Sequence, residues 1–147
     1  IKKLLFKVGF MKKYNVLFNG YRRDVNNAGL PTYSGIYIVY RCTFNEGKQT
    51  VSLKELLYIG KAENIQERIL NHNKRPEFMA ALIEGEQICY SYAEVKEQDL
   101  DIVENALVYA QKPRLNKELV DSYNHEPAQF NIEGKCSLLN YTYFSIE

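Results

Sequence analysis

The alternation of apolar and polar residues predicts a small set of strands along this chain. Residues 35–44 (GIYIVYRCTF), with their β-branched and aromatic side chains, form the strongest candidate. A turn over 45–48 leads into a second strand that ends at Ile59, and the alternating residues 87–95 (QICYSYAEV) predict a third. A further short strand over 14–18 ends at a turn-forming Asn-Gly pair.

Helices are predicted between and after these strands. Asn64 is a favourable N-cap for the first helix because its side chain can accept a hydrogen bond from the first turn. A second helix follows over 76–86, and a third begins at Asp99 or Asp101 and ends before Pro113. The resulting order is ββααβα, which predicts an α+β domain in which helices pack on a small sheet.

The remaining segments are rich in turn-forming residues. Residues 24–34 are predicted to form a connector. In the C-terminal part, 119–147, turns are predicted at 124–127 and 132–135, before a closing strand over 138–144. This part is too short to fold as an independent domain.

Composition and charge exclude some classes of function. The chain has 147 residues, 46% of them hydrophobic and 25% charged, as in an ordinary globular domain. The net charge of +1 argues against a histone-like electrostatic binder. The charge is unevenly distributed, however. Residues 1–30 hold seven basic side chains and one acidic side chain, Asp24, which gives a net charge of +6. Residues 31–147 therefore carry a net charge of −5. The basic residues are Lys2, Lys3, Lys7, Lys12, Lys13, Arg22 and Arg23. This basic end either follows a phosphate backbone or is simply a solvated face.

The cysteines and the N-terminus give weaker indications. Cys42, Cys89 and Cys136 are too widely spaced for a structural zinc site, and free cysteines favour a reducing compartment such as the cytoplasm. No stretch has the length of a membrane span, so no membrane partner is expected. The first residues resemble a signal peptide only superficially, because Lys7 interrupts the apolar run. Met11 is an alternative natural start, so whether the preceding residues are native stays open.

Glu104 is the residue whose position most needs an explanation. It interrupts or borders the apolar stripe formed by Leu100, Val103, Leu107 and Val108 on the third predicted helix. A carboxylate among apolar side chains must be paired with a cation, protonated or bound to a metal. The alternative is that Glu104 lies at the edge of the stripe and reaches water.

Arg68 and His72 form a second polar group. Because they are four residues apart, a helix would place them on one face, where they could supply an oxyanion clamp and a titratable donor. A lysine such as Lys61, placed near a tyrosine hydroxyl, can lower the pKa of that tyrosine. Each of these residues also has an ordinary explanation: a solvated surface for the charged side chains, and strand packing for Tyr37 and Tyr58.

Taken in order, these residues resemble the GIY-YIG nuclease family. The resemblance rests on Gly35-Ile36-Tyr37, Tyr58-Ile59-Gly60-Lys61, Arg68 with His72, Glu104, and Asn116 after Pro113. It covers roughly residues 33–118 and implies a small three-stranded antiparallel sheet flanked by helices, in agreement with the ββααβα order. Residues 1–32 then form a basic N-terminal extension, and 119–147 form a C-terminal extension packed on the core.

The resemblance implies a role for each motif residue. Glu104 would bind a single divalent cation, Mg²⁺ or Mn²⁺, that stabilises the leaving oxygen. Arg68 would clamp the scissile phosphate, and Tyr58 would hydrogen-bond the phosphate or the attacking water. Asn116 would have the structural role of tying the end of the late helix to the site.

Three further residues are implied to handle the attacking water. Tyr37, assisted by Lys61, would orient or deprotonate it, and His72 could share the proton transfer. The identity of the general base stays open at this point.

The expected function is therefore a metal-dependent endonuclease that hydrolyses phosphodiester bonds of DNA, double-stranded DNA being the expected partner. Two alternatives are a catalytically inactive nucleic-acid-binding module and a structural protein whose tyrosines pack its sheet. The connection over 41–57 is longer than is usual for the family, and no target-recognition domain is recognisable. Only the basic N-terminal segment, this connection and the C-terminal segment are available to provide specificity.

Overall fold

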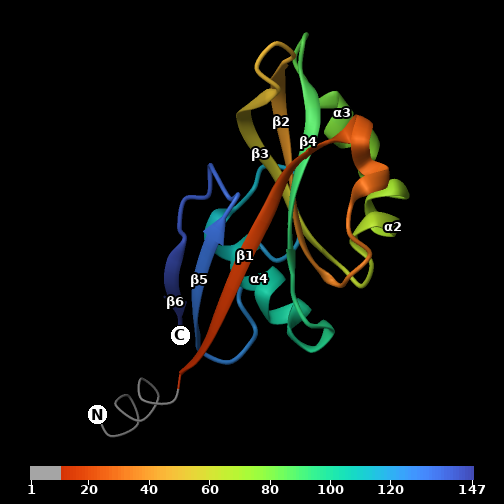
Figure 1. Cartoon of the computed structure of the whole chain (residues 1–147). Helices are drawn as coiled ribbons and strands as arrows, with labels where there is room; N and C mark the ends of the chain where they lie inside the picture. The colour runs from red at the N-terminus through yellow and green to blue at the C-terminus, as the bar shows by residue number, and fades with distance from the viewer. Residues whose placement is uncertain (1–10) are drawn as a thin grey trace, which may run out of the picture.

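One mixed sheet of six strands organises the residues that the computed structural model describes, 11–147 (Figure 1). The predictions for the first ten residues, including Lys2, Lys3 and Lys7, lie outside this range. The strands are β1 (Lys12–Arg23), β2 (Gly35–Asn45), β3 (Thr50–Ala62), β4 (Gln87–Glu94), β5 (Ala128–Gly134) and β6 (Tyr143–Ile146). The helices are α2 (Ile65–Leu70), α3 (Arg75–Ala80) and α4 (Leu100–Gln111), with 3₁₀ turns η1 (Asp24–Gly29) and η2 (Glu97–Asp99).

The predicted three-stranded antiparallel sheet is wrong. The strand order is β3-β2-β4-β1-β5-β6, and the sheet is mixed because β1 and β5 run parallel while the other neighbouring strands are antiparallel. The three strands expected for the core, β3, β2 and β4, are neighbours at one end of this larger sheet. In Figure 1 the sheet is curled, and β1 runs diagonally between the two halves.

The error has a local cause in β1. The Asn-Gly pair at residues 19–20, expected to end the strand, lies inside it, and the register against β4 shifts between Gly20 and Arg22. A bulge of this kind absorbs a residue without ending the strand. Since β1 is long, it can pair with β4 through its second half and with β5 through its first half.

The second cause is β5, whose residues 132–134 were expected in a turn. Ala128, Phe130 and Ile132 are buried and alternate with more exposed residues, the pattern of a half-buried strand. Its parallel partner β1 lies more than a hundred positions earlier, and such a pairing leaves no local signal in the sequence. The closing strand β6 starts at Tyr143, later than the predicted 138–144.

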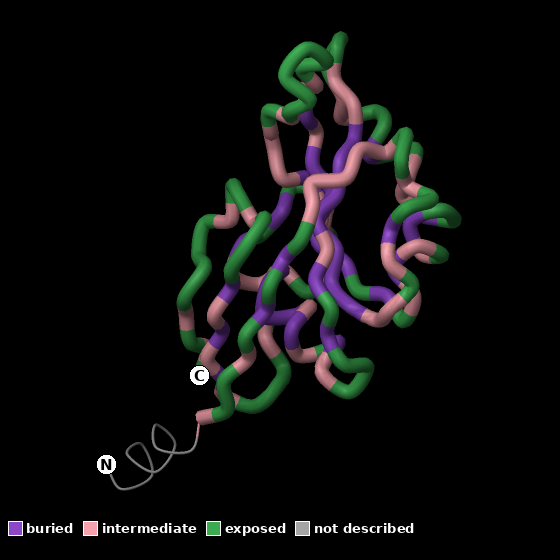
Figure 2. The backbone as a smooth tube through the Cα atoms, viewed as in Figure 1, coloured by how far each residue is buried: buried purple, intermediate pink, exposed green. Residues whose placement is uncertain are grey.

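The helices cover both faces of the β3-β2-β4 region. Alternate residues of β2 point to opposite faces: Ile36 and Ile38 lie in a core completed by α4, whereas Tyr37 and Val39 lie in a second core under α2 and α3. Figure 2 shows this buried backbone along the central strands. The α4 prediction is confirmed, whereas the helix predicted over 76–86 is the shorter α3.

The strand from the predicted N-terminal extension is part of the same sheet, since β1 pairs with β4. The division of the chain at residues 32 and 118 stays a prediction. Within residues 11–147 no helix has the length and the apolar character needed to cross a membrane.

Candidate active site

The two tripeptides lie side by side on neighbouring strands. Gly35-Ile36-Tyr37 begins β2, Tyr58-Ile59-Gly60 lies near the end of β3, and Tyr37 is the register partner of Gly60. A side chain at Gly60 would place its Cβ 2.5 Å from Cζ of Tyr37, so only glycine leaves room for the tyrosine ring. A Cβ at Gly35 would overlap the carbonyl group of Ala93. Both glycines are therefore explained by close approach.

Tyr37 and His72 form a buried hydrogen-bonded pair. The hydroxyl oxygen of Tyr37 lies 2.6 Å from Nε2 of His72, and the two residues are 1% and 8% exposed. The imidazole packs against Tyr58 and Phe78, with ring centroids 5.6 and 4.9 Å away. This aromatic enclosure fixes the orientation of both rings.

The hydrogen bonds of His72 define where its proton lies. Burial, together with the positive charges of Arg68 and Lys74, lowers the pKa of His72 to about 4, so the ring is neutral at pH 7. The backbone N–H of Lys74 donates to Nδ1 over 3.1 Å. A neutral imidazole that accepts at Nδ1 carries its proton on Nε2, which therefore donates to the Tyr37 oxygen.

This arrangement determines what Tyr37 can do. Burial raises the pKa of the Tyr37 hydroxyl, and the neighbouring Arg68 offsets the rise only in part. Tyr37 is thus protonated at neutral pH, and its own O–H is free to donate to a group other than His72. The Lys61 ammonium, which was expected to assist Tyr37, instead forms an ion pair with Asp101 on α4.

Five of the seven predicted site residues line one cleft of about 730 Å³. They are Tyr58, Lys61, Arg68, Glu104 and Asn116. The other two, Tyr37 and His72, are buried directly behind Tyr58, in ring contact with it. The structure thus brings together side chains from β2, β3, α2, α4 and the segments that follow the two helices.

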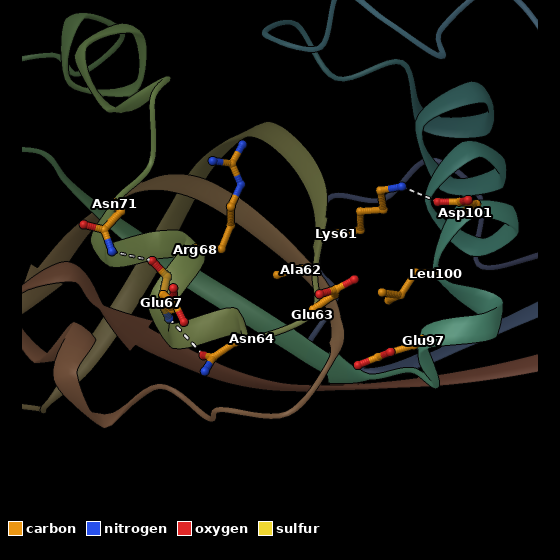
Figure 3. Close-up of a pocket in the computed structure, with 10 residues that line it drawn as sticks. All are labelled: Lys61, Ala62, Glu63, Asn64, Glu67, Arg68, Asn71, Glu97, Leu100 and Asp101. Carbon is orange, nitrogen blue, oxygen red and sulfur yellow. Dashed lines mark hydrogen bonds and ion pairs between the residues drawn. The ribbon is translucent and has the colours of Figure 1, made fainter.

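Arg68 projects from the last turn of α2. Its Nη2 donates to Oδ1 of Asn73 over 3.1 Å, and no carboxylate of residues 11–147 forms an ion pair with it. Figure 3 shows Lys61 and Asp101 approaching each other across the adjoining hollow, with Arg68 on the side of α2. The prediction that Arg68 and His72 share a helix face is wrong, because α2 ends at Leu70. The turn that follows nevertheless directs His72 toward the same site.

The N-cap of α2 explains how Arg68 is positioned. The side chain of Asn64 accepts a hydrogen bond from the Glu67 amide over 3.0 Å, as predicted. This bond fixes the start of a helix of only six residues, which propensity alone would not stabilise. Buried Ile65 and Ile69 then hold the helix on the sheet, and Arg68 faces the cleft.

Glu104 is half-buried on α4 and lines the cleft. Burial raises the pKa of its carboxyl group, while the charge and backbone amide of Lys61 partly counteract the rise. Among the described residues no lysine, arginine or histidine forms an ion pair with it. A cation bound beside it would stabilise the charged form of this carboxyl group.

The donor set limits which cation could bind. No three His, Cys, Asp or Glu side chains within residues 11–147 are grouped so that they could hold a metal ion. A metal in the described part would therefore have fewer than three ligands of these four residue types. A single hard carboxylate such as Glu104 fits Mg²⁺, which commonly keeps several waters and takes further oxygens from a substrate phosphate.

Asn116 links the segment after α4 to the edge strand β3. Its Nδ2 donates to the Ile59 carbonyl over 2.9 Å, and its Oδ1 accepts from the Ile59 amide over 3.0 Å. The side chain thus pairs with β3 as a neighbouring strand would. Because Ile59 follows Tyr58, this pairing also fixes the backbone of a cleft residue.

Sequence reasoning missed several lining residues. They are Asn73, Lys74, Asp101, Asn105, Lys117, Glu118, Leu119 and His125. Asn105 is 2% exposed and holds the carbonyls of Leu119 and Ser122 over 3.3 and 2.9 Å. A second polar residue in the apolar run of α4 was the signal that could have identified it. The other lining residues depend on loop conformations that carry no such pattern.

Comparisons of the chain with protein-family models, with curated proteins and with solved structures found no match. The interpretation of the cleft therefore rests on its own residues and their geometry.

Proposed function

We propose that this protein is a metal-dependent endonuclease of the GIY-YIG kind that hydrolyses phosphodiester bonds of DNA. The observation that supports the proposal is the convergence of a half-buried carboxylate, an arginine without an ion pair and a tyrosine on one cleft, namely Glu104, Arg68 and Tyr58. A phosphodiester needs cationic and hydrogen-bonding groups around its non-bridging oxygens, and this cleft supplies both.

In this proposal Glu104 holds the cation, Mg²⁺ or Mn²⁺. When bound, the metal supplies Lewis-acid stabilisation of the charge that develops on the leaving oxygen. The residues around Glu104 favour a cation in two ways. The carboxylate has no ion pair in the described chain, and Lys61 is held by Asp101 instead. Glu118, another carboxylate that lines the cleft, adds negative charge nearby.

The protein's own groups bind and orient the reactants. The guanidinium of Arg68 would bind two non-bridging oxygens of the scissile phosphate, and Tyr58 would donate a further hydrogen bond. Tyr37, held by His72, would orient the attacking water. The water oxygen forms its bond to phosphorus as the P–O3′ bond breaks, and the displaced proton ends on O3′, leaving 5′-phosphate and 3′-hydroxyl ends.

The raised pKa of Tyr37 assigns it an orienting role in this scheme. A phenol whose pKa is raised by burial donates a hydrogen bond at neutral pH and does not remove a proton. The proton of the attacking water would then pass to solvent or to the leaving group.

The second candidate is a nucleic-acid-binding module without catalysis. The limited set of metal-binding side chains in residues 11–147 favours it. The two candidates differ in one property: only the enzyme requires a cation at Glu104.

The test is the conversion of supercoiled plasmid DNA to nicked and linear forms by the purified protein. The proposal predicts cleavage with Mg²⁺ or Mn²⁺, none with excess chelator, and none by the Glu104→Gln variant. Plasmid binding without nicking in either metal would refute the enzyme and support the binding module. Because the cysteines at 42, 89 and 136 are all free, the proposal places the protein in a reducing compartment such as the cytoplasm.

A further inference from the structure

A second hollow, of about 600 Å³, opens at the C-terminal half of β1 and shares no residue with the active cleft. Its charged and aromatic lining residues are Arg22, Arg23, Lys135, Tyr21, Phe44 and Tyr92. We call it the β1 hollow.

Three segments contribute to the β1 hollow. Two lie outside the part of the chain that resembles the family, and the third is the connection that is longer than is usual for it. Arg22 and Arg23 come from the N-terminal segment, Phe44 from the long connection over 41–57, and Lys135 from the C-terminal segment. Specific contacts hold these segments together. The Arg23 guanidinium lies 3.6 Å from the centre of the Phe44 ring, and the Lys135 amide donates to the Phe18 carbonyl over 2.9 Å.

The lining carries positive charge without compensation. Arg22, Arg23 and Lys135 line it, and none of the lining residues is an aspartate or a glutamate. The acidic residue next in the sequence, Asp24, is directed elsewhere, because its carboxylate accepts hydrogen bonds from Arg75 and Tyr90.

The arginines of the chain differ in whether they form ion pairs. All six arginines of the chain lie within residues 11–147. Arg41, Arg75 and Arg114 form ion pairs with carboxylates, whereas Arg22, Arg23 and Arg68 form none there. Since Arg68 lies in the active cleft, the arginines without ion pairs are confined to the cleft and the β1 hollow. An arginine without a carboxylate partner is available for phosphate oxygens.

Arg23 is also held in place before any ligand binds. Arg23 stacks on Phe44, and its Nε donates to the Gln87 side chain over 2.8 Å. Nε of Arg22 is buried and has no hydrogen-bond partner in the protein. A buried donor without a partner is costly, and this one belongs to an arginine that lines the hollow.

We propose that the β1 hollow binds the phosphodiester backbone of the DNA that the active cleft cuts, as a second contact away from the scissile bond. The identity of the ligand rests on the proposed function; the anionic character of the ligand rests on the hollow alone. Guanidinium groups bind phosphate through paired N–H donors, and the surrounding tyrosines and phenylalanine provide an amphipathic wall for the sugar. The hollow thus gives the three additional segments a common role in substrate binding.

The experiment measures binding of a fluorescein-labelled duplex DNA to the Glu104→Gln protein at several salt concentrations. The triple variant Arg22→Gln/Arg23→Gln/Lys135→Gln should bind more weakly, and the slope of log K against log salt should fall by about 2 to 3 because each lost phosphate contact removes about 0.9. The matched control is Arg114→Gln, whose arginine is exposed and paired with Glu55, and which should keep the slope.

A second variant separates lost contacts from a folding defect. Arg22→Lys/Arg23→Lys keeps both charges and should retain most of the salt slope if phosphates are contacted. Equal slopes for the triple variant and Arg114→Gln would overturn the inference, even in a protein that cuts DNA. Conversely, the predicted loss of slope in a protein that never cuts DNA would refute the endonuclease activity. It would still support phosphate binding in the β1 hollow.

Discussion

The hydroxyl oxygen of Tyr37 accepts a hydrogen bond from Nε2 of His72 over 2.6 Å, although Tyr37 belongs to β2 and His72 to the turn after α2. The backbone amide of Lys74 fixes the other ring nitrogen. Two parts of the chain that are far apart in sequence are therefore connected behind the cleft. The connection leaves the Tyr37 proton available to an acceptor other than His72.

The buried imidazole predicts a pH-dependent stability that His72→Gln removes. Its pKa is about 4 in the folded protein, against 6.5 for an unperturbed histidine. Between these values the unfolded chain binds more protons, so the free energy of unfolding rises with pH from 4 to 6.5 and is level above. Over this pH range the free energy of unfolding should increase by about 3 kcal/mol, at 1.36 kcal/mol per pKa unit.

Denaturant unfolding from pH 4 to 7.5 measures this effect. The wild-type stability should fall more steeply than that of His72→Gln as the pH drops below 6.5. His125→Gln is the matched control, since His125 is the other histidine of the chain, is exposed, and should leave the wild-type slope unchanged. Parallel curves for the wild type and His72→Gln would contradict the buried neutral imidazole.

Replacing Glu104 by glutamine should stabilise the protein in the absence of metal. Burial raises the folded pKa of Glu104 above its unfolded value of 4.5, so its contribution to stability is present at low pH and is lost as pH rises through the folded pKa. Glutamine has the same shape without the charge. In chelator at pH 8 we expect a rise in Tm of about 3 °C, the shift that ~1 kcal/mol produces in a domain of this size.

With added Mg²⁺ the wild-type protein should instead have the higher Tm of the two. A ligand that binds only the folded state at 100 times its Kd stabilises by about 2.7 kcal/mol, and Glu104→Gln should lose this stabilisation. Thermal melts with and without Mg²⁺ compare the two proteins. An equal Mg²⁺ response from both would show that the cation binds elsewhere.

Gly60→Ala should destabilise the protein because the new methyl group overlaps the Tyr37 ring. Overpacking of a closed core costs about 1–3 kcal/mol, and the displaced ring would also disturb the contact with His72. Gly47→Ala is the control: its nearest neighbour would lie 3.6 Å away, in an exposed turn. Urea unfolding should therefore separate the two variants, and equal midpoints would show that the close approach is unimportant.

Part of this fold was predictable from the sequence. The strand β2 is rich in β-branched and aromatic residues, β3 and β4 lie next to turn-forming residues, and α2 has an N-cap in Asn64, so local patterns identified them. The parallel pairing of β1 with β5 was not predictable. It joins Lys12 to Ala128, and each strand alone looks short or turn-like. The sheet was therefore predicted with too few strands.

The same limit applies to the candidate site. The order of Tyr37, Tyr58, Arg68 and Glu104 in the sequence suggested one site only because it resembles the order of motifs in a known nuclease family. The partners of these residues could not be inferred. Arg68 is supported by Asn73 through a turn, and Lys61 pairs with Asp101 across two elements. Such contacts depend on the way the elements pack and leave no spacing pattern in the sequence.

Arg68→Lys should reduce cleavage although it keeps the charge. Lysine cannot present two parallel donors to the phosphate, and loss of one transition-state hydrogen bond of this kind costs about 10²–10³ in kcat. The measurement is the single-turnover rate of duplex cleavage at saturating protein. Arg114→Lys, whose arginine pairs with Glu55, should cut at the wild-type rate. A wild-type rate for Arg68→Lys would remove Arg68 from the phosphate site.

The central claim, that the cleft around Glu104 cuts phosphodiesters, is tested most directly by following binding and cleavage of one labelled duplex in parallel. With Mg²⁺ the wild-type protein should bind and cut the duplex to 5′-phosphate and 3′-hydroxyl ends. The Glu104→Gln variant should bind it with similar affinity and leave it intact. Cleavage by Glu104→Gln at the wild-type rate would contradict the account.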